Sequence, residues 1–190
     1  MLVYKGTFIN DKPNGEFTYF YPDGITKARS YFYNDGNKSI TTTYHHSGKK
    51  MSEGFYSGKE KDNLWKYYNS NGILLKEEFY RNSKKHGIWK TFYADGQTAE
   101  ETSWFNDMKN GPWIQYFPDG HKKLEAIYVA DEKDGKALYY YPSGKIDVSG
   151  FYQKSLRTGE WLYLDEEGNL IKKEVYENGS MVNEMDYRKQ

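Results

Sequence analysis

Aromatic and polar positions recur along this chain with a period of 24 residues. One glycine marks each repeat without interruption, at Gly24, Gly48, Gly72, Gly96, Gly120, Gly144 and Gly168. A fixed period of this length is typical of arrays in which each repeat is one small structural unit stacked on the next. The repeat is therefore the first feature that any account of the fold must explain.

Each repeat contains two predicted strands and two turns. We number the repeat from the residue two places before the usual Trp, so that Gly87 is position 1 and Trp89 is position 3. Positions 2 to 7 and 12 to 19 are rich in aromatic and β-branched residues, which favour strands. Between them, residues 22–24 and 118–120 read Pro-Asp-Gly, in which Pro fixes φ and Gly accepts a left-handed backbone. Each repeat is thus predicted to be a β-hairpin, and no segment shows a helical period.

The sequence predicts an all-β chain, an elongated single-sheet solenoid of stacked antiparallel β-hairpins with a 24-residue repeat. We interpret residues 1–190 as a single repeat domain. A half repeat covers residues 1–14, seven repeats start at residues 15, 39, 63, 87, 111, 135 and 159, and a half repeat covers residues 183–190. Counting each half repeat as one strand gives about 16 strands.

Charge pairs favour one register across each hairpin. With position 4 opposite position 15, Lys66 faces Glu77 and Lys90 faces Glu101, as cross-strand ion pairs require. The same register sets position 3 against position 16, which holds small residues such as Gly54, Ala126 and Gly150. One face then carries Phe17, Trp65, Trp89, Trp113 and Trp161 together with the aromatic residues of position 18, and the other face carries Phe20, Tyr44, Tyr68, Phe92, Tyr116 and Tyr140.

Composition limits the possible functions. The chain has 27 basic and 27 acidic residues, so no net charge attracts nucleic acid. It has no cysteine, which excludes disulfides, thiolate metal sites and a Cys nucleophile. We find no signal peptide and no apolar run long enough for a membrane helix. Because the chain begins within a repeat, a leader could have been removed, and the compartment is left open.

The repeat resembles a MORN repeat, in the diverged bacterial form described as a YwqK-type antitoxin. Gly87 and Gly111 match the opening Gly, Asp95-Gly96 and Asp119-Gly120 match the turn, Gly54-Phe-Tyr56 and Gly150-Phe-Tyr152 match the Gly-x-aromatic segment, and Asn106 and Asn178 match the Asn of the linker. The resemblance implies a twisted sheet of hairpins that serves as a binding scaffold. The chain departs from the pattern in its period, 24 rather than the usual 23 or so, and at position 16, where Glu78 and Glu174 replace Gly.

From these features we expect a non-enzymatic scaffold that binds another protein, including a toxin as one form, or that binds a second copy of itself. A single-layer sheet cannot cover both faces, so aromatic rings should remain exposed on one of them and form a binding surface. The candidate binding face consists of Trp65, Trp89, Trp113, Trp161, Tyr56, Tyr80, Trp104, Tyr128 and Tyr152.

A row of cations recurs at position 23 of the repeat. Its members are Lys61, Lys85, Lys109, Lys133 and Arg157. They form a candidate basic rim, which either solubilises the edge of the array or holds it weakly to an anionic membrane surface. Neighbouring acids such as Asp62 and Asp134 dilute this charge.

Other functions remain as alternatives. Rows of Tyr and Trp could bind carbohydrate or cell wall, and the segment from Trp161 to Gly168 is similar to a choline-binding repeat, which holds a quaternary ammonium group in an aromatic cage. An enzyme that uses the carboxylates at position 15, Glu53, Glu77, Glu101 and Glu125, is the weakest hypothesis, since a flat sheet offers no cleft. The four histidines are too dispersed to hold a metal, and we expect no cofactor.

Overall fold

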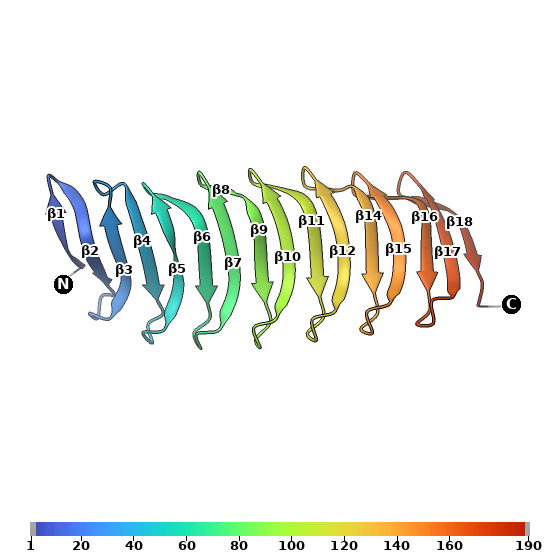
Figure 1. Cartoon of the computed structure of the whole chain (residues 1–190), viewed down its shortest axis with the longest axis horizontal. Helices are drawn as coiled ribbons and strands as arrows, with labels where there is room; N and C mark the ends of the chain where they lie inside the picture. Colours follow the sequence, from blue (N-terminus) through green and yellow to red (C-terminus); the bar gives the residue numbers. More distant parts are fainter. Residues whose placement is uncertain (1–2, 189–190) are drawn as a thin grey trace. The chain divides into compact units, whose positions relative to one another are not determined.

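The computed structural model describes residues 3–188, and all the regular secondary structure of that range is β-strand. It confirms the all-β, antiparallel hairpin architecture (Figure 1). The chain divides into two compact units, Met1–Gly96 and Gln97–Gln190, which we call the N-terminal and C-terminal units. Residues 3–188 contain no helix that could cross a membrane.

The N-terminal unit contains nine strands within its described residues. They are β1 (Tyr4–Ile9), β2 (Lys12–Phe20), β3 (Thr26–Tyr33), β4 (Lys38–Tyr44), β5 (Lys50–Ser57), β6 (Glu60–Tyr68), β7 (Leu74–Arg81), β8 (Lys84–Lys85) and β9 (Gly87–Phe92). Each strand from β1 to β6 pairs antiparallel with the next, and β7 pairs with both β8 and β9.

The C-terminal unit repeats this arrangement within its described residues. Its strands are β10 (Thr98–Phe105), β11 (Met108–Tyr116), β12 (Lys122–Val129), β13 (Glu132–Lys133), β14 (Gly135–Tyr140), β15 (Ile146–Gln153), β16 (Leu156–Leu164), β17 (Leu170–Glu177) and β18 (Ser180–Asp186). Here β12 pairs with both β13 and β14, and the other neighbours pair in chain order. The short strands β8 and β13 lie at positions 22 and 23 of the repeat, outside the predicted strands, and His86 and Asp134 separate them from β9 and β14. Counting them separately gives 18 strands within residues 3–188 rather than about 16.

The hairpin turns follow the sequence prediction. The marker glycines all have positive φ, between 82° and 91°, and Gly168 in its turn donates its backbone N–H to the carbonyl oxygen of Asp165. In the seven full repeats, position 1 is also left-handed where it holds Gly or Asn, as at Gly15 (φ 71°) and Asn63 (φ 56°), whereas Ser39 does not have a positive φ. A residue with a Cβ is strained in this region of φ, which explains the preference for Gly at both positions.

The predicted register is confirmed in both units. Position 4 lies opposite position 15, as in the pairs Lys66 with Glu77 and Ile114 with Glu125. Position 3 lies opposite position 16, as in Trp113 with Ala126. Because strand side chains alternate between faces, this register fixes which side chains share a face.

Burial is concentrated at positions 3 and 16 of the repeat. Phe17 and Trp65 are each 2% exposed and Trp161 is fully buried. Each of these three rings lies over a glycine at position 16 of the preceding hairpin, namely Gly6, Gly54 and Gly150. The sheet therefore builds its core on one face, from rings that lie directly on the backbone of the neighbouring strand.

Candidate functional site

The two faces of each sheet differ in how far they are covered. We call the face that carries positions 3, 5, 16 and 18 the closed face, and the face that carries positions 2, 4, 15 and 17 the open face. On the closed face, rings and long side chains cover one another. On the open face, apolar side chains remain exposed. The two faces therefore have to be judged separately as binding surfaces.

Trp65 shows how the closed face is packed in the N-terminal unit. Its ring centroid lies 4.8 Å from that of Tyr56, in a T-shaped contact. Its Nε1 donates a hydrogen bond to the carbonyl oxygen of Phe55 at 3.0 Å, and Lys61 Nζ lies 4.8 Å from its ring centroid. Trp65 is consequently an internal residue, and the expectation that its ring is exposed for binding is wrong.

Trp161 has the same role in the C-terminal unit. It lies between Tyr152 and Tyr176, with centroid distances of 5.1 Å and 6.4 Å. The guanidinium carbon of Arg157 lies 4.2 Å from its ring centroid. Trp161 is fully buried, so its predicted exposure is also wrong.

The remaining predicted aromatic residues are half-buried on the same face of their own units. In the N-terminal unit, Trp89 contacts Tyr80 at 5.3 Å and donates to the carbonyl oxygen of Phe79. In the C-terminal unit, Trp113 contacts Tyr128 at 5.6 Å. Trp104 is half-buried, 5.9 Å from the Nζ of Lys109. These rings are thus packing elements first, and whether their exposed edges bind a partner stays a prediction.

The candidate basic rim is folded inward over the aromatic rings. Each of the five cations is half-buried. Lys61 lies over Trp65, Lys85 over Trp89 at 4.7 Å, Lys109 over Tyr128 at 5.0 Å, Lys133 over Trp113 at 5.0 Å and Arg157 over Trp161. Cation–π attraction of this kind is worth about 0.5–2 kcal/mol per contact. These charges therefore stabilise the closed face, which leaves them less available to an anionic surface.

Two buried carboxylates complete the closed face, and sequence reasoning did not assign them a role. Glu174 is 6% exposed and accepts hydrogen bonds from Tyr163 (2.5 Å), Tyr176 (3.0 Å) and Lys172 (2.5 Å). Arg157 lies 3.4 Å away. Burial raises the pKa of the Glu174 carboxyl, but these hydrogen bonds outweigh burial and hold that pKa below its ordinary value.

The same network occurs 96 residues earlier. Glu78 is 5% exposed, accepts hydrogen bonds from Lys76 (2.7 Å) and Tyr80 (2.9 Å), and has a pKa held below its ordinary value despite burial. The network could have been found from a combination of residues in the sequence. Glu at position 16 occurs together with Lys at position 14 and Tyr at positions 5 and 18. Glu78 and Glu174 each lie beside a cation, and we therefore interpret both networks as contributions to the stability of the fold.

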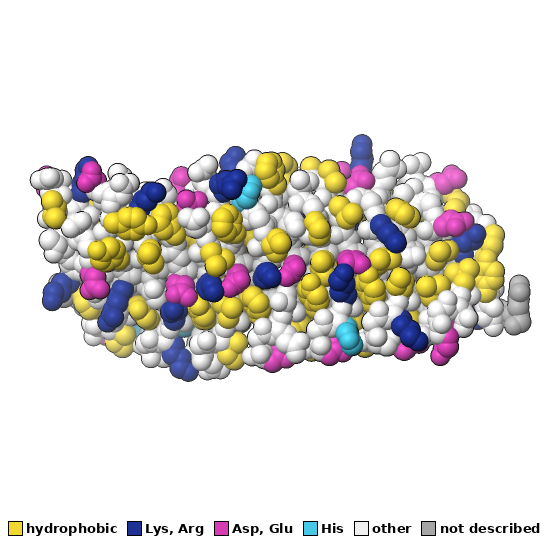
Figure 2. All heavy atoms as spheres, viewed as in Figure 1, with side chains coloured by type: hydrophobic (Ala, Val, Ile, Leu, Met, Phe, Trp, Pro, Cys, Tyr) yellow, Lys and Arg dark blue, Asp and Glu magenta, His cyan; other side chains and the backbone are white. Residues whose placement is uncertain are grey.

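The open face of the N-terminal unit carries a band of exposed apolar side chains. Tyr31, Ile40, Leu64 and Ile88 are 55%, 56%, 41% and 53% exposed. Phe55 and Phe79 lie between them, half-buried, opposite Ile40 and Leu64 in the register. We call these six residues the apolar band. Figure 2 shows hydrophobic side chains gathered along this face, beside a row in which acidic and basic side chains alternate.

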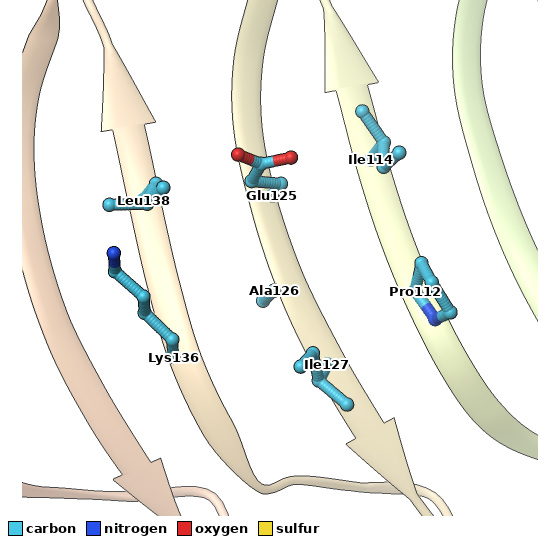
Figure 3. Close-up of a pocket in the computed structure, with 7 residues that line it drawn as sticks. All are labelled: Pro112, Ile114, Glu125, Ala126, Ile127, Lys136 and Leu138. Atoms are coloured by element: carbon cyan, nitrogen blue, oxygen red, sulfur yellow. The ribbon is translucent and has the colours of Figure 1, made fainter.

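The open face of the C-terminal unit adds a hollow of about 320 Å³ (Figure 3). Pro112 and Ile114 of β11, Ile127 of β12 and Leu138 of β14 line it, together with the charged side chains of Glu125 and Lys136. Ile127 is 43% exposed, and the nearby Phe151 is 50% exposed. A mostly apolar recess of this kind is suited to receive a single side chain from a partner.

The row of charges on the open face of the N-terminal unit contains two ion pairs. Lys66 lies 3.1 Å from Glu77, and Lys50 lies 2.7 Å from Glu53. Glu53 also accepts a hydrogen bond from the Tyr68 hydroxyl at 2.6 Å. Burial and this hydrogen bond raise the pKa of Tyr68 to about 12. For Glu53, the bonds from Lys50 and Tyr68 outweigh burial and lower its pKa. The Glu53 carboxylate is therefore an ionised partner in an ion pair.

The histidines contact nearby backbone and side-chain groups. His45 lies 3.0 Å from the carbonyl oxygen of Tyr68, and His46 lies 2.8 Å from Asp23. His121 lies 2.9 Å from the carbonyl oxygen of Pro142. Across the described part of the chain, no three His, Cys, Asp or Glu side chains gather in an arrangement that could hold a metal ion.

Comparison with known protein families identifies these repeats. Five consecutive segments match the MORN repeat variant model, at residues 61–82, 85–106, 109–130, 133–154 and 157–178. Together they cover more than half of the chain. A search among curated proteins found no match.

Proposed function

The chain belongs to the MORN repeat variant family, and we propose that it is a non-enzymatic scaffold that binds another protein through its open face. MORN repeats are in general scaffolds that bind proteins or membranes, and the family is a non-catalytic one. The observation that carries the proposal is the apolar band, in which Ile40, Leu64 and Ile88 are each more than 40% exposed. A contiguous group of exposed apolar side chains on a sheet face is typical of an interaction surface.

The apolar band lies on the opposite face from the residues whose packing stabilises the fold. The rings that hold the fold together, such as Trp65, lie on the closed face, where the cations cover them. The side chains of the apolar band are not needed for that packing. Sequence reasoning identified a binding surface of aromatic rings, and the exposed fractions favour the opposite face.

Charge identifies the kind of partner. The ionic groups beside the apolar band include two ion pairs, Lys66 with Glu77 and Lys50 with Glu53, and the ammonium of Lys38, which lies 5.9 Å from the ring centroid of Phe55. A face on which charges of both signs are mixed and partly paired attracts nucleic acid or anionic lipid only weakly, since both need clustered cations. It suits a protein surface with an apolar centre and a mixed polar rim, which is the usual anatomy of protein interfaces.

A toxin-neutralising role is the narrower form of the same proposal. It rests on the resemblance of the repeats to the bacterial YwqK-type antitoxin form. In that role the apolar band would cover part of the toxin, and a stable complex would bury about 800 Å² on each partner. This narrower form requires that the partner be a toxin, and identifying the partner tests it.

The test introduces negative charges into the apolar band and measures the loss of partner binding. The triple variant Ile40→Glu, Leu64→Glu and Ile88→Glu places three acids in the apolar band. A matched control, Ser47→Glu, Asn71→Glu and Ala94→Glu, places the same charges on exposed hairpin turns. A partner is first captured from the native organism by cross-linking, identified and purified. We expect the band variant to bind it at least about tenfold more weakly, whereas the turn control binds like the wild type.

Two results would contradict the proposal. Equal affinity of wild type and band variant for the purified partner would remove the apolar band from the interface. A stable dimer of wild-type chains in sedimentation velocity that the band variant abolishes would identify the occupant as a second copy. Circular dichroism of each variant shows whether the fold is retained.

A further inference from the structure

A pocket of about 700 Å³ opens on the closed face of the N-terminal unit, at the repeat that starts at Ser39. Its lining includes three nearly buried hydroxyl residues, Ser30, Ser39 and Thr41, which are 6%, 3% and 7% exposed. The rings of Phe32 and Tyr56 also line it. The pocket lies outside the family-matched segments, which begin at residue 61.

The pocket exists because this repeat lacks the large side chains that fill the same place in the next one. Twenty-four residues further on, the place is occupied by Trp65, Tyr67 and Lys61, which contact one another. The equivalent residues here are Thr41, Thr43 and Asn37. A Trp, a Tyr and a Lys are thus all replaced by small polar residues in one repeat.

The loss of a Trp does not by itself open a pocket. Position 3 is also small at Ala137, yet Ala137 is fully buried, with Trp113, Tyr139 and Trp161 packed around it. The gap at Thr41 is left unfilled. A close-packed interior normally closes such a space, so the open volume at Thr41 points to a ligand.

The backbone is also built differently at this repeat. Strands β3 and β4 pair without interruption from Ala28–Thr43 to Tyr33–Lys38. By contrast, β5 and β6 have a bulge between Glu53 and Phe55. Ser39 replaces the left-handed Gly or Asn of position 1, which allows the regular ladder. Sequence and backbone therefore change together around the pocket.

The pocket offers hydrogen bonds, apolar ring faces and positive charge. Ser30 Oγ and Thr41 Oγ1 lie 2.8 Å apart, and because only one of them donates to the other, one hydroxyl proton remains available to a ligand. Lys27 and Lys59 also line the pocket, and within residues 3–188 neither has a carboxylate at ion-pair distance. No acidic residue lines the pocket.

We propose that this pocket binds an anionic sugar, a pyranose ring that carries a carboxylate or phosphate group. The rings of Phe32 and Tyr56 contact the apolar face of the sugar, the hydroxyls of Ser30 and Thr41 bond its hydroxyl groups, and Lys27 and Lys59 attract its charge. An aromatic side chain from a partner would fill the space but leave the hydroxyls and lysines unmatched. An ammonium ligand is disfavoured by the two lysines.

This site is independent of the protein-binding proposal, since it lies on the opposite face. The probes are D-glucuronate, glucose 6-phosphate, neutral D-glucose, inorganic phosphate and N-acetyltryptophanamide, each titrated into the full chain and followed by saturation-transfer NMR and calorimetry. We expect both acidic sugars to bind, and at least about tenfold more tightly than glucose or phosphate alone. The two acidic sugars distinguish a carboxylate ligand from a phosphate ligand.

Two variants and a control locate the binding. Thr41→Trp introduces the residue of the next repeat and should abolish binding. The fold should be kept, because Trp113 is accommodated although Thr102, not Gly, precedes it at position 16. Lys27→Gln with Lys59→Gln changes only exposed side chains and should remove the preference for acidic over neutral sugar. Thr42→Trp adds the same ring to the open face of the same strand and should leave binding unchanged.

Each remaining result overturns the proposal. Equal binding of phosphate and glucuronate would show a simple anion site, and binding of N-acetyltryptophanamide in place of the sugars would show an aromatic slot. Absence of binding by both acidic sugars, or retention of binding in Thr41→Trp, would remove the sugar from this pocket.

Discussion

The ring of Trp161 lies against the backbone of Gly150, at a distance that leaves no room for a side chain. A Cβ atom placed on Gly150 would lie 2.3 Å from Cδ2 of the ring. Trp161 belongs to the hairpin after that of Gly150, so the contact joins consecutive repeats. Gly150 is therefore needed for the full burial of a ring in the next repeat rather than for its own hairpin, whose position 3 is Ala137.

We expect Gly150→Ala to lower the free energy of unfolding by about 1–3 kcal/mol, because the added methyl group forces the buried ring to move. Urea unfolding, followed by Trp fluorescence and circular dichroism, measures the loss. A double-mutant cycle with Trp161→Ala supplies the control, since the methyl group should cost much less once the ring is absent. An equal cost in both backgrounds would show that the ring is not the cause.

Glu174→Gln should destabilise the C-terminal unit by about 1–3 kcal/mol at neutral pH, because Lys172 and Arg157 lose their charged partner. The folded pKa of Glu174 is lowered, so its stabilisation is fully present above the unfolded value of about 4.3 and is lost as the pH falls through the folded value. The difference between wild type and variant should therefore shrink from about pH 6 to about pH 3.

The matched control for this variant is Glu160→Gln. Glu160 also pairs with a lysine, Lys173 at 2.9 Å, but its side chain is 58% exposed. We expect it to cost less than about 1 kcal/mol. Equal costs for the two variants, or a constant difference across the pH range, would contradict the burial argument.

Lys61→Met should lower stability by about 0.5–2 kcal/mol, although methionine keeps the apolar stem of the side chain. Lys61 Nζ lies 4.8 Å from the ring centroid of Trp65, 5.0 Å from that of Tyr67 and 5.4 Å from that of Tyr80. The control is Lys84→Met, which removes an exposed charge from the same unit. Thermal unfolding of both variants decides the matter, and an equal effect would mean that the charge on Lys61 contributes nothing through the rings.

Substitution of a single side chain by Ala should lower the free energy of unfolding more on the closed face of the N-terminal unit than on its open face. Phe17 is 2% exposed on the closed face, and Ile40 is 56% exposed on the open face. We expect Phe17→Ala to cost about 3 kcal/mol or more and Ile40→Ala less than about 1 kcal/mol. Chemical unfolding of both variants measures the difference. A large cost for Ile40→Ala would show that the apolar band supports the fold, which would weaken its assignment as a binding surface.

Much of the fold could be predicted from the repeat. The spacing of the marker glycines, such as Gly96 and Gly120, located the hairpin turn of each repeat, and the pairing of Lys66 with Glu77 indicated the register. These features are local, since a left-handed turn residue and a cross-strand ion pair each depend on a few neighbouring positions. Which face is exposed was harder to predict, because exposure depends on what the next repeat places over a given residue.

The sequence alone determined the period, the hairpin, the turn chemistry and the division of side chains between two faces, because these follow from backbone preferences and strand alternation. Only the tertiary structure decided which face is covered. Trp65 and Trp161 are buried because glycines of the preceding hairpin let the rings lie on the backbone and because Lys61 and Arg157 fold over them. Thr41, which in sequence is simply a missing Trp, lines an open pocket, whereas the equally small Ala137 is sealed by its neighbours. Burial is a property of the whole packed environment, and a single residue type does not specify it.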